Sequence, residues 1–197
     1  MKSLVVAPVL VGAYGVARIA DGLDGSRGPG LAWTVGHLCF LAALVLFVQI
    51  FGRLRAMAGG GVVATAGYAA GLIGALALAA QFTIDLVVGF LSADHDAMGP
   101  RFEAVKAIPG VEPVVYTVVP LLFYVGMVVL VARLAAGRRV PWWSAVLVLV
   151  QAVLPLVSKD LIPLGAALLL LAFVPLLRLR PARPAVAARS PVGARSR

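Results

Sequence analysis

The sequence predicts an all-α membrane protein: a bundle of six transmembrane helices with both termini in the cytoplasm. The composition and the distribution of charge predict this fold class. Of the 197 residues, 62% are hydrophobic and only 13% are charged, whereas soluble domains have roughly 45–50% apolar and about 25% charged residues. So few charges cannot cover so much apolar surface in water. We therefore expect one six-span domain over residues 1–177, followed by a tail over residues 178–197.

The first three apolar segments are residues 4–20, 31–51 and 62–91. A helix needs about 20 apolar residues, within a range near 17–25, to cross the hydrocarbon core, and isolated strands cannot satisfy their backbone there. The first segment follows Lys2 in the manner of a signal peptide. Arg18 interrupts its end, however, and the alternation of charge along the chain requires the segment. We therefore expect a retained span.

Residues 92–113 form the one sizeable connection between the apolar segments. Pro100 suits the first turn of a helix, and Phe102, Val105 and Ile108 would then share one face of that helix. We expect a short helix that opens at Pro100, ends at Pro109 and lies on the outer surface of the membrane.

The last three apolar segments are residues 114–136, 142–157 and 161–177. The final two contain 16 and 17 residues and therefore reach only about 24–26 Å, less than a ~30 Å hydrocarbon core. Their linker, Ser158 to Asp160, is then drawn toward the membrane. Residues 142–177 make either two full crossings or a re-entrant hairpin, because both arrangements return the chain to the same side.

The basic residues predict the orientation of the bundle. If the N-terminus is inside, the inner segments hold twelve Lys and Arg and no acid, whereas the outer segments hold five basic and seven acidic residues. The excess of Lys and Arg on cytoplasmic segments therefore places both termini inside. The outer basic residues are Arg18, Arg27, Arg101, Lys106 and Lys159. The Arg-, Ala- and Gly-rich composition resembles that of small bacterial membrane proteins, so we expect a location in the cell (plasma) membrane.

The tail over residues 178–197 has six arginines, three prolines and no acid, a composition that predicts disorder. Each basic residue near a membrane surface contributes about 1 kcal/mol of attraction to anionic lipid headgroups. The expected partners are thus the lipid bilayer and its anionic headgroups. The net charge of +9 is explained in this way, and no nucleic acid partner is expected. A homo-oligomer or a membrane-protein partner is compatible with the sequence.

Asp85 is the one acidic residue inside a predicted span. Ionisable residues at such positions usually face the bundle interior or a water-filled cavity. Gln81, Gly74, Gly71 and Gly67 lie on the same helix face as Asp85. This face therefore carries polar residues toward the outside and small residues toward the cytoplasm, where glycines allow neighbouring helices to pack closely.

A second ionisable residue lies at the depth of Asp85. His37 is six residues into the second span and Asp85 is six residues before the end of the third, so both are roughly 9 Å deep from the outer side. We expect a contact between His37 and Asp85. Arg18 is the rival partner for this carboxylate, followed by Lys159 or water. An outward-opening polar pocket is expected, completed by Gln81, Tyr116 and Asp160.

The sequence contains no motif of known catalytic chemistry that would indicate an enzyme. Neither a cofactor nor a metal is expected. Asp94, His95 and Asp96 are metal-ligand types, but three consecutive side chains do not converge easily, so a solvated loop is favoured. Two hypotheses follow. The chain is a small permease, channel or proton-coupled transporter with Asp85 as the working group, or it is a scaffold or accessory subunit in which Asp85 is a structural ion-pair partner. A membrane enzyme is the third and weaker hypothesis.

Overall fold

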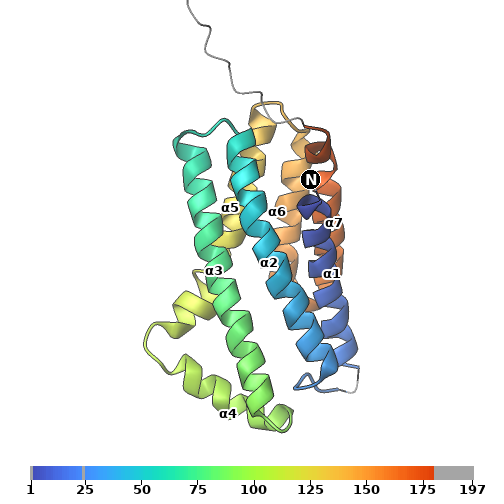
Figure 1. Cartoon of the computed structure of the whole chain (residues 1–197), viewed down its shortest axis with the longest axis vertical. Helices are drawn as coiled ribbons and strands as arrows, with labels where there is room; N and C mark the ends of the chain where they lie inside the picture. The colour runs from blue at the N-terminus through green and yellow to red at the C-terminus, as the bar shows by residue number, and fades with distance from the viewer. Residues whose placement is uncertain (1, 24, 180–197) are drawn as a thin grey trace, which may run out of the picture.

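The computed structural model describes residues 2–23 and 25–179. Helix makes up 84% of the structure, and the described residues contain no strand, which confirms the predicted all-α class. The predicted tail from residue 180 onward lies outside the described residues. Six helices run along the long axis of the molecule (Figure 1): α1 (Ser3–Asp21), α2 (Leu31–Met57), α3 (Gly61–Leu91), α5 (Leu121–Ala136), α6 (Trp142–Val157) and α7 (Ile162–Arg178).

These six helices form a closed ring. Each helix packs on the next in the order α1, α2, α3, α5, α6 and α7, and α7 packs back on α1. α2 and α5 also meet across the interior of the ring. The buried residues form one continuous cluster. Its most deeply buried side chains, each at most 2% exposed, lie toward the end of the bundle where the chain starts: Phe47, Ile50, Phe51, Leu54, Met127, Leu130, Leu134, Phe173 and Leu176.

The outward faces of the helices are also apolar. Val16, Val45 and Leu76 are 58%, 65% and 69% exposed, and in water such surface would cost about 25 cal/mol for each Å². Five helical units are long and apolar enough to cross a membrane: α1, α2, α3, residues Glu112–Ala136 and residues Lys159–Arg178. α6 is apolar but has only 16 residues. Length and composition thus indicate a multi-pass membrane protein.

α3 and α5 approach each other so closely that only glycine fits between them. A Cβ atom on Gly74 would lie 2.0 Å from the backbone nitrogen of Phe123, and one on Gly126 would lie 2.4 Å from the backbone nitrogen of Gly71. The same Gly126 Cβ would also lie 2.5 Å from the carbonyl oxygen of Gly67. The glycine face of α3 is therefore occupied within the molecule, where it brings two backbones together.

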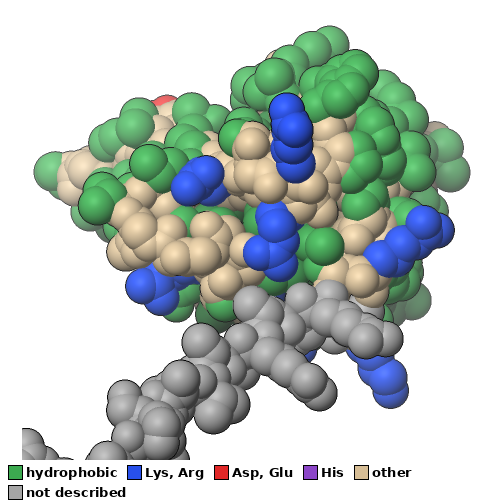
Figure 2. Space-filling model, turned by 90° about the horizontal axis from the view of Figure 1, so that it is seen from above, with side chains coloured by type: hydrophobic (Ala, Val, Ile, Leu, Met, Phe, Trp, Pro, Cys, Tyr) green, Lys and Arg blue, Asp and Glu red, His purple; other side chains and the backbone are tan. Residues whose placement is uncertain are grey.

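One end of the bundle gathers positive charge. Among the described residues this end holds seven basic side chains and no acidic one: Lys2, Arg53, Arg55, Arg133, Arg138, Arg139 and Arg178. Figure 2 shows this face, with Lys and Arg side chains standing among hydrophobic ones. The α2–α3 turn here needs glycine, because Gly59, Gly60 and Gly61 have φ values of 80°, 68° and 84°, which residues with a Cβ rarely adopt. We call this the basic end.

The opposite end, which we call the mixed-charge end, holds the α1–α2 loop (residues 22–30), α4 (His95–Lys106) and the short 3₁₀ helix η2 (Lys159–Leu161). Figure 1 shows α4 standing to the side of the bundle, beyond the last turn of α3. The segment that joins α4 to α5 returns to the ring partway along α3 and includes the π-helical segment η1 (Glu112–Thr117).

The prediction that the connecting helix opens at Pro100 is wrong. α4 begins at His95, because the carboxylate of Asp94 accepts a hydrogen bond of 2.9 Å from the backbone N–H of Ala97 and caps the helix. Pro100 lies inside the helix. Ile108 lies beyond its C-cap and is 54% exposed, so it does not share a packed face with Phe102.

The fourth apolar segment is not one continuous α-helix. Its first part is η1, and α5 begins only at Leu121. Pro113 and Pro120 have no backbone N–H, so they cannot continue the regular hydrogen-bond ladder. The carbonyl of Pro113 instead accepts the N–H groups of both Val118 and Val119. The wider turn that results sets the direction of Tyr116, which lies within η1.

Candidate functional site

Asp85 and His37 face each other across the contact between α3 and α2. His37 Nε2 lies 3.8 Å from Asp85 Oδ2, and the two side chains are only 6% and 13% exposed. The other ring nitrogen, Nδ1, lies 2.7 Å from the carbonyl oxygen of Trp33. A carbonyl oxygen can only accept a hydrogen bond, so Nδ1 carries a proton and Nε2 is the nitrogen that responds to the carboxylate.

This arrangement makes the His37–Asp85 pair a place where one proton can be held. Without an added proton, a lone pair on Nε2 would face a carboxylate oxygen, and the two would repel each other. With one added proton, the pair is neutral overall, either as a carboxylic acid beside imidazole or as a carboxylate beside imidazolium. The separation of 3.8 Å exceeds a direct hydrogen bond, so transfer between the two groups requires an approach of about 1 Å.

Aromatic rings enclose His37. The centre of its ring lies 4.1 Å from that of Trp33, 5.1 Å from that of Phe82 and 5.7 Å from that of Tyr14. Tyr14 and Phe82 also contact each other, with ring centres 5.1 Å apart. Rings packed in this way hold the imidazole in one orientation and keep bulk water away from it.

Tyr116 reaches Asp85 from η1. Its hydroxyl donates to Asp85 Oδ1 over 3.4 Å, which is a long hydrogen bond. The ammonium nitrogen of Lys106, at the end of α4, lies 5.7 Å from the centre of the Tyr116 ring. Single turns of π-helix are frequent at functional sites, and here such a turn carries the residue that contacts the carboxylate. Gln81 lies one turn before Asp85 on α3 and is partly buried.

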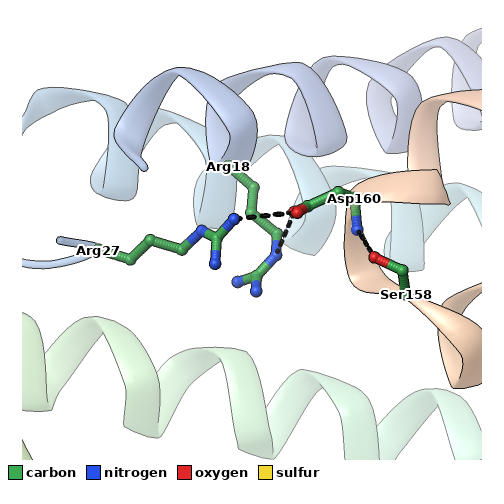
Figure 3. A network of polar contacts seen from close by, with 4 residues as sticks. All are labelled: Arg18, Arg27, Ser158 and Asp160. Atoms are coloured by element: carbon green, nitrogen blue, oxygen red, sulfur yellow. Dashed lines mark hydrogen bonds and ion pairs between the residues drawn. The ribbon is translucent and has the colours of Figure 1, made fainter. Parts of the chain in front are cut away.

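Arg18 contacts the carboxylate of Asp160 and not that of Asp85. Its Nε lies 3.8 Å from Asp160 Oδ1, while Arg27 Nη2 lies 2.9 Å and 3.2 Å from the two oxygens of Asp160. Figure 3 shows the two arginine side chains converging on this carboxylate from the α1 side. The backbone N–H of Asp160 donates to Ser158 Oγ over 3.2 Å. Lys159 is the exposed neighbour of Asp160 on η2.

A cavity of about 470 Å³ opens beside the arginines, and its lining includes Arg18, Arg27, Trp33 and His95. A much smaller void of about 10 Å³ lies between Arg18, Trp33 and His37. Arg18 and Trp33 line both spaces, so the cavity and the void beside His37 are neighbours. The imidazole Nδ1 of His95 donates to the carbonyl oxygen of Arg27 and thereby joins α4 to the α1–α2 loop.

The residues expected to form one pocket thus lie in two groups. The first is the buried group of His37, Asp85 and Tyr116, and the second is the group at the cavity, where Arg18 meets Asp160. Sequence reasoning missed Arg27, Trp33 and His95 as members of the second group. The one sequence signal for Arg27 was that the charge distribution placed it on the same side as Asp160. Its side chain could not be placed more closely, because a loop has no periodicity.

The described chain is therefore a ring of helices, five of them able by length and composition to cross a membrane, with a His–Asp pair near one end. No protein-family model, curated protein or solved structure matches it. The geometry of the two groups is therefore the basis for assigning a function.

Proposed function

We propose that the protein is a small proton-coupled transporter or channel of the cell membrane. In this proposal the ring of six helices crosses the bilayer six times, both termini are cytoplasmic, and the mixed-charge end faces outward. The proton is held by the His37–Asp85 pair. Solute or counter-ion would approach from the outer side, where the cavity of about 470 Å³ opens.

Three observations support this topology. Asp160, at the tip of the α6–α7 hairpin, lies 2.9 Å from Arg27 in the α1–α2 loop, so the hairpin extends to the level at which α1 ends. That reach favours two full crossings over a re-entrant hairpin. The seven basic residues of the basic end favour a cytoplasmic position for that end, and Trp142, 74% exposed beside it, suits the membrane interface.

The observation that carries the proposal is the pairing of His37 with Asp85. Ionisable groups within a membrane are costly, and they commonly mark proton relays or ion paths. Histidine is also the side chain whose unperturbed charge changes between pH 5 and 8. Arg18 and Trp33 line both the cavity and the small void beside His37, so a movement of these two side chains would bring outer water closer to the pair.

The test is proton uptake into liposomes that contain purified protein and a trapped pH-sensitive dye, with a potassium diffusion potential as the driving force. Uptake is recorded with the potential alone and with small anionic, cationic and neutral solutes added in turn. We expect wild-type protein to acidify the liposomes above the rate of empty ones. Asp85→Asn should lower that rate at least tenfold, because asparagine cannot take up the proton.

Asp96→Asn is the matched control for that substitution, because Asp96 is an exposed carboxylate in the first turn of α4 and should leave the rate unchanged. Protein variants are compared only after size-exclusion chromatography shows the same monodisperse peak. Equal proton uptake by wild type and Asp85→Asn under every condition would contradict the proposal, as would wild-type uptake no faster than that of empty liposomes.

One observation favours the second function, a scaffold or accessory subunit with a structural ion pair. Both members of the pair are at most 13% exposed, and a paired buried charge can fix the register of two helices. In that case His37→Gln and Asp85→Asn should both lower the melting temperature, and affinity purification should recover one fixed membrane-protein partner. The proton-uptake assay distinguishes this function from the transporter, because only the transporter needs the Asp85 carboxyl group for uptake.

A further inference from the structure

The cavity at the mixed-charge end has two chemically different walls. Arg18, Arg27 and His95 supply the polar part of its lining, whereas Trp33, Met98 and Phe102 supply an apolar part. Its volume of about 470 Å³ falls within the roughly 300–1,000 Å³ that is usual for small-molecule sites. The lining therefore suits a ligand with one charged group and one apolar body.

The arginines of this cavity have hydrogen-bond donors to spare. A guanidinium has five N–H donors and no acceptor. Here the guanidinium groups of Arg18 and Arg27 share the single carboxylate of Asp160 (Figure 3). Among the described residues, the buried Nε atoms of both Arg18 and Arg27 have no hydrogen-bond partner. A buried donor without a partner is costly, so an acceptor that drew either Nε atom toward the cavity would be stabilised.

We propose that this cavity binds a small organic carboxylate with an apolar body, and that Asp160 occupies the arginine pair as an internal competitor when the ligand is absent. Arg27 already contacts both oxygens of one carboxylate through Nη2 alone, and a free carboxylate can engage two nitrogens of a guanidinium in parallel. The apolar body of the ligand lies against Trp33 and Phe102. We assign no such competing role to Asp21, which lines a neighbouring cavity of about 440 Å³ and has contacts of its own.

The binding test does not depend on the proposed proton coupling, although Arg18 and Trp33 line both the cavity and the void beside His37. Neither His37 nor Asp85 lines the cavity, and binding is measured in detergent, where no proton gradient exists. Loss of proton uptake in Asp85→Asn and loss of ligand binding in an arginine variant are therefore independent results, and failure of one proposal leaves the other testable.

Trp33 provides the reporter for the test. The chain has three tryptophans, and the other two, Trp142 and Trp143, begin α6 at the opposite end of the bundle. In a Trp142→Phe/Trp143→Phe background, tryptophan fluorescence comes from the cavity wall alone. The purified protein is titrated with cyclohexanecarboxylate, with the neutral analogue cyclohexanecarboxamide, and with inorganic phosphate, none of which absorbs at the excitation wavelength.

We expect a saturable change in Trp33 fluorescence with the carboxylate, at a concentration at least tenfold below any change with the carboxamide or with phosphate. The carboxamide lacks the charge that the arginines bind, and phosphate lacks the apolar body. Equal affinity for carboxylate and carboxamide, or equal affinity for carboxylate and phosphate, would overturn the proposal.

Substitutions in the same background test the role of the arginines and the role of Asp160 separately. Arg27→Gln should weaken binding at least tenfold, and Arg27→Lys, which keeps the charge, should weaken it less. Asp160→Asn should tighten binding, an effect that misfolding cannot produce. The control is Arg101→Gln, which removes an arginine of the same end that lines a groove between α3 and α4 instead, and it should change nothing. Weaker or unchanged binding in Asp160→Asn would overturn the role of Asp160.

Discussion

At the scale of single residues, the depth of each carboxylate decides its partner. Asp85 lies within α3 and meets His37 at 3.8 Å, whereas Asp160 lies at the tip of a hairpin and meets Arg27 at 2.9 Å. Long arginine side chains can extend toward a membrane surface while their stems stay against apolar neighbours. A histidine near the same depth as Asp85 has no such reach, so it pairs within the bundle.

Glycine at position 74 gives a prediction about stability. A Cβ there would lie 2.0 Å from the backbone nitrogen of Phe123, and neither backbone can move without disturbing its own helix. Gly74→Ala should therefore destabilise the protein by about 1–3 kcal/mol, the usual cost of overpacking. The measurement is thermal unfolding in detergent followed by circular dichroism.

The matched control for that substitution is Gly99→Ala. Gly99 lies inside α4, and a Cβ there would meet nothing within 4 Å, so alanine should keep or slightly raise the melting temperature. If Gly74→Ala melted at the wild-type temperature, the close seam between α3 and α5 would be contradicted.

Part of the site could be read from the sequence at this scale. The depths of His37 and Asp85 follow from counting residues at 1.5 Å each, and that count suggested the contact that the structure contains. The sequence could not decide whether His37 or Arg18 pairs with Asp85, because the answer depends on Arg27. That residue takes Asp160 together with Arg18 and lies in a loop whose path no pattern specifies.

At the scale of elements, few contacts hold α4 and the α1–α2 loop together at the mixed-charge end. α4 stands beside the ring and is connected to the α1–α2 loop through His95, whose imidazole donates to the carbonyl of Arg27. Gly28 allows this approach, because a Cβ there would lie 3.3 Å from His95 Cα. The loop and α4 therefore depend on each other for their order.

Removing that imidazole should loosen both elements. We expect His95→Ala to increase hydrogen–deuterium exchange in residues 22–30 and in α4, while α2 and α5 keep wild-type protection. Exchange is followed by mass spectrometry of peptides from the purified protein. Glu103→Ala, an exposed position on α4, is the comparison and should leave exchange in the loop unchanged. Equal exchange in wild type and His95→Ala would show that the contact does not hold the loop.

Helices were easier to predict than their ends. Apolar length alone indicated the long helices, yet α2 continues to Met57, beyond the apolar segment, because Arg53 and Arg55 interrupt hydropathy without interrupting a helix. The predicted start at Pro100 was wrong because proline is also accommodated inside α4, whose first turn the Asp94 carboxylate caps. The π-helical turn of η1 was missed because periodicity does not show how Pro113 and Pro120 redistribute hydrogen bonds.

At the scale of the whole molecule, charge divides the two ends. The basic end holds seven basic and no acidic residues in the described part, while the mixed-charge end contains ion pairs such as Arg27 with Asp160. The sequence predicted this division through the count of Lys and Arg, but it could not predict the ring order, which depends on contacts such as α7 with α1. The orientation in a cell is a prediction that labelling can test.

Single cysteines report the orientation, because the chain has only one cysteine of its own, Cys39. In a Cys39→Ser background, Gly99→Cys places a thiol at the mixed-charge end and Gly137→Cys places one at the basic end, both at exposed positions. A membrane-impermeant maleimide should label Gly99→Cys on intact cells and Gly137→Cys only after permeabilisation. The reverse pattern would invert the proposed topology.

The phenylalanines at the crossing of α2 and α5 have one more consequence. Phe47 and Phe51 each lie edge-on to Phe123, with ring centres 5.0 Å and 5.4 Å away, and all three are at most 5% exposed. Together these three rings fill the crossing of α2 and α5 with closely packed apolar side chains. In the transporter that we propose, this packing would close the interior of the ring at rest, so a solute that entered beside Arg27 would pass only if α2 and α5 moved apart.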